Sequence, residues 1–276
     1  PFDQVPNGVG RLGWTEMRPV GLVAAITPFN DPLNLVVHKV GPAIAAGCPV
    51  IVKPHEATPG PAKLLIKLFR ENGLPAGAFQ IIEGTGAEVG RHLVEHSAVK
   101  MVTFTGGKST GQLVASSAAG RPTALEMGGV CPTIVMADAD LDSALSRIVS
   151  GMFAAAGQNC LHVQRLLIDD AIYDTLVPRL IEETKQLKLG DPMLEETDMG
   201  HLINEESAQR CASVVEDALT LGGNLLTGGD YTGTSFQPTL LDNVPKAAQI
   251  YSQEVFGPIT VIERINGIEE AVSILT

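Results

Sequence analysis

Aromatic residues, cysteines and long apolar runs are all scarce in this sequence. Only 4% of its 276 residues are aromatic, with a single tryptophan. The four cysteines, at positions 48, 131, 160 and 211, form no CxxC pair or zinc-type cluster, so we expect no metal site. No apolar run reaches the ~18 residues that a transmembrane helix needs, so we expect no membrane partner. Reduced thiols of this kind are typical of cytoplasmic proteins, and we expect that location.

Basic residues are outnumbered by acidic ones. The sequence has 19 Lys and Arg against 31 Asp and Glu, a formal net charge of −12. Because nucleic acids present a dense row of negative phosphates, we expect no nucleic-acid partner. Residues 1–128 hold 11 basic and 9 acidic side chains (+2), whereas residues 129–276 hold 8 and 22 (−14). This change, together with the length, favours two domains that meet near residue 128.

Apolar runs of strand type alternate with helical patterns along the chain. We expect strands at 21–26, 49–53, 79–82, 101–104, 122–125, 133–136 and 163–168. We expect helices at 36–46, from 58 to 72, from 109 onward, at 140–156 and at 171–188. This alternation predicts an α/β fold of two lobes, with parallel sheets covered by helices on both faces.

Two glycine-rich segments invite a nucleotide-binding interpretation. Gly84-Thr-Gly-Ala-Glu-Val-Gly90 resembles a dinucleotide fingerprint, but its third glycine falls one position late. An ordinary strand-to-helix turn stays open as the alternative. Gly107-Lys108-Ser109 is not a P-loop, because that motif needs a glycine where this chain has Val102.

Four further residues are candidates for chemistry. Lys53 and Glu56 follow a strand, where parallel sheets bind ligands, and a carboxylate there accepts ribose hydroxyls but repels a 2′-phosphate. Glu126 ends a strand among apolar residues and glycines, an unfavourable place for a charge without a purpose. Cys160 has small and polar neighbours that give its thiol access, whereas we expect the other three cysteines to be core residues. A solvated turn or a core position is the alternative for each.

Taken in order, these segments resemble the aldehyde dehydrogenase superfamily from about Gly13 to the C-terminus. The stretches that carry the resemblance are residues 19–30, 51–56, 73–77, 104–107, 125–129, 157–160 and 253–258. Each is modest alone, but seven in the same order are specific. The resemblance implies a parallel-sheet NAD(P)-binding domain at 1–128 and an α/β catalytic domain at 129–276, both incomplete at the chain ends.

The resemblance implies that a small aldehyde is oxidised to a carboxylic acid with NAD, or possibly with NADP. Cys160 would attack the aldehyde and pass through a thiohemiacetal and a thioester. The side-chain amide of Asn30 and the Cys160 N–H would hold the oxyanion. Glu126 would activate the water that releases the acid.

The same resemblance implies the contacts to the cofactor. Lys53 and Glu56 match residues at the adenosine ribose, and Glu56 makes NAD the expected cofactor. Glu254 matches a residue at the nicotinamide ribose. Gly107 stands where many members have Ser, which removes one phosphate contact. The expected cofactor contacts are Ile26, Thr27, Lys53, Glu56, Gly86, Gly90, Thr105, Gly106, Gly107, Met127, Glu254 and Phe256.

The chain ends and two alternative functions complete the expectations. Because the chain starts at Pro1 and stops in an apolar run, we expect a fragment of a longer enzyme, which the resemblance implies is a homodimer or homotetramer. Gly107-Lys-Ser109-Thr-Gly111 also matches the G-x-S-x-G elbow of serine hydrolases. A serine hydrolase is therefore one alternative, and a non-catalytic homologue is the other. The acid and base that would serve Ser109, in the required order, are Asp191 or Asp198 and then His201.

Overall fold

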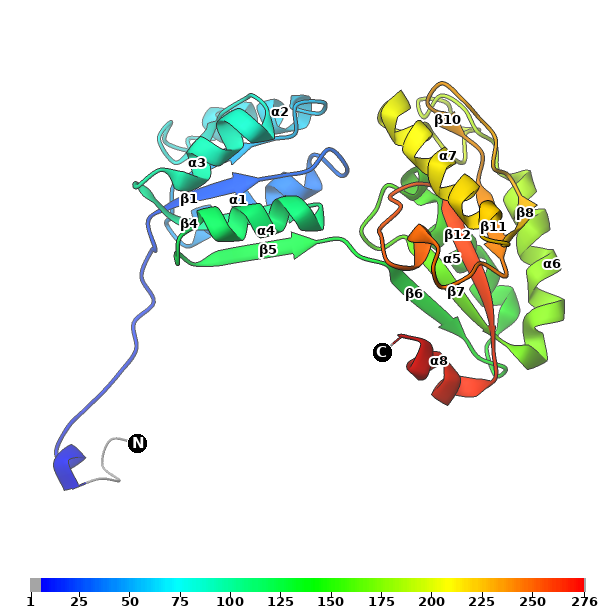
Figure 1. Ribbon diagram of the computed structural model, residues 1–276. Coiled ribbons are helices and arrows are strands. Elements are labelled where there is room, and N and C mark those ends of the chain that lie inside the picture. Colours follow the sequence, from blue (N-terminus) through cyan, green and yellow to red (C-terminus); the bar gives the residue numbers. More distant parts are fainter. Residues whose placement is uncertain (1–5, 276) are drawn as a thin grey trace. The chain divides into compact units, whose positions relative to one another are not determined.

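The computed structural model describes residues 6–275 as two units, which divide between Met127 and Gly128 (Figure 1). Each unit has its own sheet and its own hydrophobic core. A 3-10 turn at Pro6–Gly8 and a segment without regular secondary structure precede the first sheet. Among the described residues, no helix is both long and apolar enough to cross a lipid bilayer.

The first unit is a five-stranded parallel sheet with four α-helices. Its strands are β1 (Leu22–Ile26), β2 (Val50–Lys53), β3 (Phe79–Ile81), β4 (Val99–Gly106) and β5 (Thr123–Met127). Its helices are α1 (Asn34–Ala45), α2 (Gly60–Glu71), α3 (Arg91–Glu95) and α4 (Lys108–Ser117). The spatial order of the strands is β3-β2-β1-β4-β5. The chain therefore adds strands outward from β1 to one edge and then from β4 to the other edge, so the order of connection reverses between β1 and β4. That reversal is the switch point at which open α/β sheets bind ligands.

Alternating side chains of β1 explain why helices cover both faces of this sheet. Val23 and Ala25 pack into one core cluster with α1 and α2. Ala24 and Ile26 pack into the other cluster with α3 and α4. Since successive residues of a strand point to opposite faces, a strand buried on both faces is apolar throughout, as the predicted 21–26 run is.

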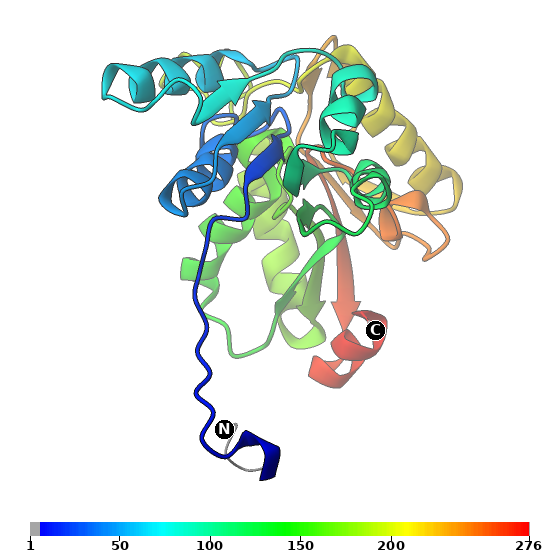
Figure 2. The same cartoon turned by 90° about the vertical axis from the view of Figure 1, so that its left-hand side faces the viewer.

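The second unit is a mixed sheet of five strands with helices α5 to α8 and a small β-ribbon. Its strands are β6 (Cys131–Val135), β7 (Val163–Asp169), β12 (Ile259–Ile265), β11 (Thr239–Asp242) and β8 (Asn224–Thr227), in that spatial order. Only β8 pairs antiparallel among these five. The helices are α5 (Leu141–Phe153), α6 (Asp170–Gln186), α7 (Glu205–Thr220) and α8 (Gly267–Leu275). The ribbon pairs β9 (Tyr231–Thr232) with β10 (Ser235–Phe236), and Figure 2 shows β12 running directly into α8.

The predicted α/β class with parallel sheets is confirmed, but one predicted helix is too long. The pattern at 140–156 predicts a single helix, whereas α5 ends at Phe153. Ala155 and Ala156 have φ values of 54° and 56°, in the left-handed region. A right-handed helix cannot continue through such residues, so the chain turns here. This turn leads to Cys160.

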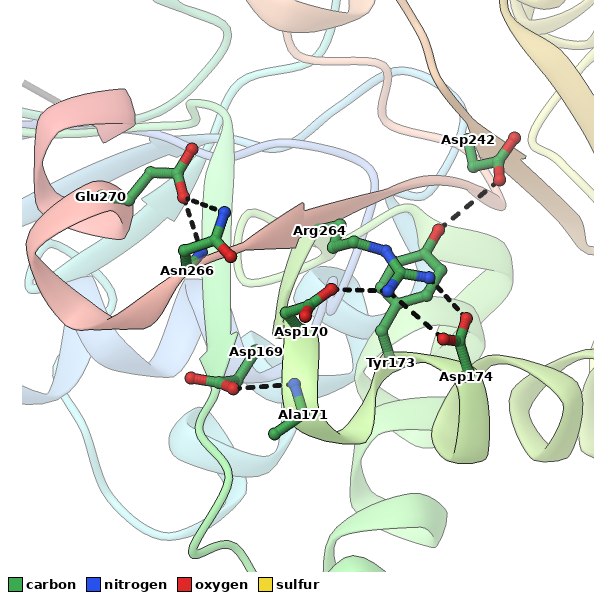
Figure 3. A network of polar contacts seen from close by, with 9 residues as sticks. All are labelled: Asp169, Asp170, Ala171, Tyr173, Asp174, Asp242, Arg264, Asn266 and Glu270. Atoms are coloured by element: carbon green, nitrogen blue, oxygen red, sulfur yellow. Dashed lines mark hydrogen bonds and ion pairs between the residues drawn. The ribbon is translucent and has the colours of Figure 1, made fainter.

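A polar network anchors α6 at the carboxyl end of β12 (Figure 3). Arg264 donates to Asp170 at 2.6 Å and also to Asp174, and its guanidinium lies 4.0 Å from the Tyr173 ring centre. Asp169 caps α6 by accepting from the Ala171 N–H at 3.0 Å. The network lies at the opposite end of this sheet from Cys160, which precedes β7.

Candidate active site

Several expected cofactor residues of the first unit, and the expected catalytic Glu126, lie where its parallel strands end. Thr27 follows β1, Lys53 ends β2, Gly106 ends β4, and Glu126 and Met127 end β5. Because these strands run in one direction, their carboxyl ends share one edge of the sheet. The expected contacts are thereby brought together around the switch point.

Lys53 and Glu56 form an ion pair at this edge. The Lys53 side chain is buried, and its Nζ lies 3.1 Å from Glu56 Oε2 and donates to the Pro54 carbonyl at 3.3 Å. Glu56 is half exposed. Burial acts to raise the Glu56 pKa, but hydrogen bonds from its own N–H and from Lys53 outweigh burial and lower the pKa below 4.5. Glu56 therefore presents an ionised carboxylate that can accept hydroxyl hydrogen bonds.

Thr27 carries a buried hydroxyl that lacks a partner within the described residues. Its N–H donates to the Lys53 carbonyl at 3.2 Å, which fixes the backbone. Its Oγ1 is buried and has no hydrogen-bond partner. A buried polar atom left in this way is unfavourable, and a ligand that bonds it removes the penalty. Asn30 lies three residues further along, half-buried in the loop before α1.

Glycines leave space beside these polar groups. A Cβ on Gly86 or Gly107 would meet no atom within 4 Å, so the backbone is open to a ligand at both positions. A Cβ on Gly106 would lie 2.6 Å from the Phe104 ring, so a larger residue is excluded there. Gly90 packs near the Lys53 side chain. Open backbone, an ionised carboxylate and an orphaned hydroxyl on one sheet edge fit a dinucleotide.

Glu126 lies near a buried lysine, Lys39, that no sequence motif marks. Lys39 of α1 donates to Thr103 Oγ1 at 3.1 Å and is only 8% exposed. Burial lowers the pKa of Lys39 to about 8, and the Glu126 carboxylate opposes that shift. Glu126 itself is exposed, on the strand next to Thr103. Helical spacing in an apolar segment gives no sign that one lysine faces the sheet.

In the second unit, Cys160 is exposed on a turn that Gln158 fixes. The Gln158 side chain is buried and donates to the carbonyls of Ala155 at 3.0 Å and His201 at 3.3 Å. Its Oε1 accepts from the Ile203 N–H at 2.8 Å. Three hydrogen bonds from one buried side chain hold the backbone that precedes the thiol.

The residues on either side of Gln158 shape the same turn. Gly157 has a φ of 67°, and a Cβ there would overlap the Gly257 carbonyl. Asn159 Oδ1 accepts from the Leu161 N–H at 2.9 Å and from Cys160 Sγ at 3.7 Å. The turn therefore leaves no room for a side chain at position 157 and uses an acceptor oxygen at position 159.

Gln164 on β7 attaches the segment that carries Glu254. Its Nε2 donates to the carbonyls of Ile250 at 2.6 Å and Gln253 at 2.8 Å, and its Oε1 accepts from the Val255 N–H at 2.8 Å. β7 and β12 are parallel neighbours. Glu254 and Cys160 thus both lie at the amino end of this sheet, because each precedes its strand.

Glu254 is half-buried and has one oxygen without a partner. Its Oε1 is buried and unbonded among the described residues. Burial raises the Glu254 pKa, and Arg210 opposes that shift. Gly128 packs against this carboxylate so closely that a Cβ would overlap it. Phe256 follows with a φ of 49°, and Arg210 donates to the carbonyls of Val255 and Phe256.

Cys131 corrects an expectation. From the sequence we expect a core residue, but Cys131 is half-buried, and its Sγ donates to the Cys160 carbonyl at 3.0 Å. Cys48 and Cys211 are buried, as expected. The correction depends on the pairing of β6 with β7, which no local pattern specifies. Within residues 6–275, no group of three or more His, Cys, Asp or Glu residues is arranged to hold a metal ion.

Ser109 lies in a different setting from an elbow nucleophile. An elbow serine stands on the strained turn between strand and helix. Ser109 is instead the second residue of α4, an ordinary helical position. Asp191 and Asp198 accept hydrogen bonds from the backbone N–H groups of Met193 and Lys188, both at 2.9 Å. The structure therefore gives the hydrolase alternative no support.

Comparison with known proteins decides the family. The sequence model described as "Aldehyde dehydrogenase family" matches residues 3–275. The chain belongs to the aldehyde dehydrogenase family. It is 44% identical over 273 residues to the 3-sulfolactaldehyde dehydrogenase of Priestia megaterium, covering 99% of this chain and 57% of that protein. It is 42% identical over 274 residues to aspartate-semialdehyde dehydrogenase 1 of Pseudomonas canavaninivorans, covering 99% and 58%.

Solved aldehyde dehydrogenases share the fold. Betaine aldehyde dehydrogenase of Staphylococcus aureus, in complex with NAD+, superposes with a TM-score of 0.90 and 35% identity, over 93% of this chain and 53% of that one. A glyceraldehyde-3-phosphate dehydrogenase of Methanocaldococcus jannaschii, complexed with NADP, gives a TM-score of 0.88 and 39% identity, over 93% and 57%. The chain thus spans somewhat more than half the length of the relatives it matches.

Proposed function

We propose that this chain provides the cofactor-binding and nucleophilic parts of an NAD(P)-dependent aldehyde dehydrogenase, which oxidises an aldehyde to a carboxylic acid. The observation that carries the proposal is the exposed thiol of Cys160 on a turn fixed by Gln158, in a family member whose other unit has a dinucleotide-type edge. A nucleophilic thiol needs both access and a fixed position. The Ser109 hydrolase has no comparable support.

Cys160, Asn30 and Glu126 would divide the chemical work. The Cys160 sulfur forms a bond to the aldehyde carbon, and the carbonyl oxygen becomes an oxyanion held by the Asn30 amide and the Cys160 N–H. A nicotinamide cofactor, when bound, would supply the acceptor for the hydride that leaves the same carbon. Glu126 then takes a proton from the water that attacks the thioester, which releases the acid and the thiol. All three positions are filled, which favours an enzyme over a non-catalytic homologue.

The other expected contacts would bind the cofactor. Glu56, paired with Lys53, would accept the ribose hydroxyls of the adenosine half, and Thr27 would donate or accept through its orphaned hydroxyl. Backbone near Gly86, Gly90 and Thr105 through Gly107 would approach the pyrophosphate. Ile26 and Met127 would line the site, and Glu254 and Phe256 of the second unit would face the nicotinamide half. The Glu56 carboxylate favours NAD over NADP, because it would repel a 2′-phosphate.

The proposal extends to substrate class, assembly and location. The relatives are named for different aldehydes, so we assign an aldehyde and no particular one. We infer a homodimer or homotetramer and a cytoplasmic location; the family supports the first, and cysteines without a disulfide framework support the second.

The decisive test follows the reduced nicotinamide absorbance with NAD or NADP and a panel of aldehydes. The Cys160→Ala variant should lose activity by ~10⁴-fold or more, because the nucleophile is removed. Cys48→Ala, in the core of the first unit, and Ser109→Ala are the controls, and both should keep the chemistry. Ester cleavage that persists in Cys160→Ala and disappears in Ser109→Ala would overturn the proposal.

A further inference from the structure

A second thiol lies beside Cys160. Cys131 is the first residue of β6, and the register of β6 with β7 places it opposite Val163, three residues after Cys160. Its Sγ donates to the Cys160 carbonyl at 3.0 Å. A carbonyl oxygen lies about 2.4 Å from its own Cα. The Cys131 sulfur is therefore no more than about 5.4 Å from the Cys160 Cα.

The Cys131 sulfur therefore lies against the Cys160 backbone, near the carbon that bears the Cys160 side chain. A disulfide needs the two sulfurs about 2.05 Å apart. Cys131 is fixed by the β-ladder, whereas Cys160 lies on a turn outside any strand. A rotation of the Cys160 side chain can bring its sulfur toward Cys131 without disturbing the sheet. The two cysteines also differ in access, because Cys160 is exposed and Cys131 is half-buried.

We propose that Cys131 is the resolving thiol of a reversible disulfide with Cys160, which forms when a hydroperoxide oxidises Cys160. In the first step, the Cys160 thiolate attacks the peroxide O–O bond, giving Cys160–SOH and an alkoxide or hydroxide, which takes a proton from water to become an alcohol or water. In the second step, the Cys131 sulfur attacks the sulfenic sulfur, and its proton leaves with the hydroxyl group as water. Two electrons leave the thiol pair and reduce the peroxide. A dithiol reductant restores both thiols by thiol–disulfide exchange.

The electrostatics of the pair set the order of these steps. Burial raises the Cys131 pKa, and negative charge on Cys160 and on Glu254 raises it further. Negative charge on Cys160 therefore favours the thiol form of Cys131 over the more nucleophilic thiolate. Oxidation to the neutral sulfenic acid removes the Cys160 charge, so one cause of the raised pKa disappears. The second thiol thus becomes more nucleophilic after the first has been oxidised.

The disulfide would protect Cys160 from irreversible damage. Without a nearby thiol, a sulfenic acid proceeds to sulfinic and sulfonic acids, which ordinary thiols do not reduce. When Cys160 is linked to Cys131, its sulfur cannot act as a nucleophile, but a thiol reductant can restore it. The cross-link itself does not depend on the proposed dehydrogenase reaction; only its effect on activity does.

The test treats the native protein with equimolar hydrogen peroxide and then blocks thiols with N-ethylmaleimide before denaturation. Trypsin cuts after Arg147, so Cys131 and Cys160 fall on separate peptides. The expected result is a linked peptide pair, lighter than the sum of the two by two hydrogens, which dithiothreitol separates. Sulfinic acid on Cys160 with no linked pair, in the wild-type protein, would overturn the proposal.

Matched variants separate the resolving role from general thiol chemistry. Cys131→Ser keeps the size and a hydrogen-bond donor, and should abolish the linked pair and convert Cys160 to the sulfinic acid. Cys48→Ser alters a buried cysteine of the other unit and should leave the linked pair unchanged. If the protein is an active dehydrogenase, dithiothreitol should restore the peroxide-treated wild type and fail to restore Cys131→Ser. A wild-type linked pair in a protein without dehydrogenase activity would uphold this inference and reject the proposed function.

Discussion

At the scale of single residues, Thr27 shows how a proposed binding position can reduce stability. Its buried Oγ1 has no partner among the described residues, although its N–H is bonded to β2. Thr27→Val replaces that hydroxyl by a methyl group of similar size. We expect the variant, without cofactor, to be more stable than the wild type by about 1 kcal/mol, because a buried unsatisfied group is removed. We expect the same change to weaken NAD binding.

Thr58 offers the matched control for this prediction. Its Oγ1 donates to the Phe29 carbonyl at 3.1 Å, so Thr58→Val removes a hydrogen bond that is made. That variant should be less stable than the wild type. Urea unfolding without ligand gives the stabilities, and titration calorimetry gives the NAD affinity. Equal destabilisation by both substitutions would show that the Thr27 hydroxyl is satisfied after all.

At the scale of elements, His162 joins the Cys160 turn to β7 and to the end of α5. It is 5% exposed, and its Nε2 has no partner within the described residues. Burial lowers the His162 pKa to about 4, and a hydrogen bond to the Met152 carbonyl opposes that shift. In the unfolded chain the pKa is about 6.5. Between these values the unfolded chain binds a proton that the folded chain does not.

Stability should therefore be full above about pH 6.5 and fall as the pH drops toward 4, by up to about 3 kcal/mol from this residue. His162→Gln cannot take up the proton, so its unfolding free energy should depend less on pH over this range. Urea unfolding at pH 7 and pH 5 measures the difference. His201→Gln, at an exposed position of the same unit, is the control and should keep the wild-type slope. Parallel slopes in all three proteins would contradict the prediction.

At the scale of the whole molecule, the sequence predicts the elements better than it predicts their neighbours. Apolar strands such as β1 and β2 are predictable because burial on both faces requires an unbroken apolar run. The short strands β8 to β11 are not, since β8 and β11 have four residues each and depend on their pairing for definition, and β9 with β10 is a two-residue ribbon. Lys39 was missed for the same reason, because its neighbours Thr103 and Glu126 come from strands far along the chain.

The residues of the candidate site also fall into those that local motifs indicate and those that depend on long-range pairing. Cys160, Glu126 and Lys53 could be named as candidates from local motifs, but their roles come from the resemblance of seven ordered stretches and stay predictions. Cys131 could not be recognised as a neighbour of Cys160, since their contact follows from the register of β6 against β7. The hydrogen bond between Gln164 and the segment that carries Glu254 also joins positions far apart in the sequence.

The division of the hydrophobic cores predicts how the chain loses structure. Each core cluster lies entirely on one side of the Met127–Gly128 division, with Val102 in the first unit and Met152 in the second. Met152 is fully buried, so Met152→Ala should destabilise its own unit by about 2–5 kcal/mol. Hydrogen exchange followed by mass spectrometry should then show faster exchange in β6, β7, β11 and β12, with β1 to β5 unchanged. Val102→Ala should do the reverse. Because each cluster of the described residues belongs to a single unit, faster exchange in both sheets after either substitution would mean that the two units unfold as one cooperative body.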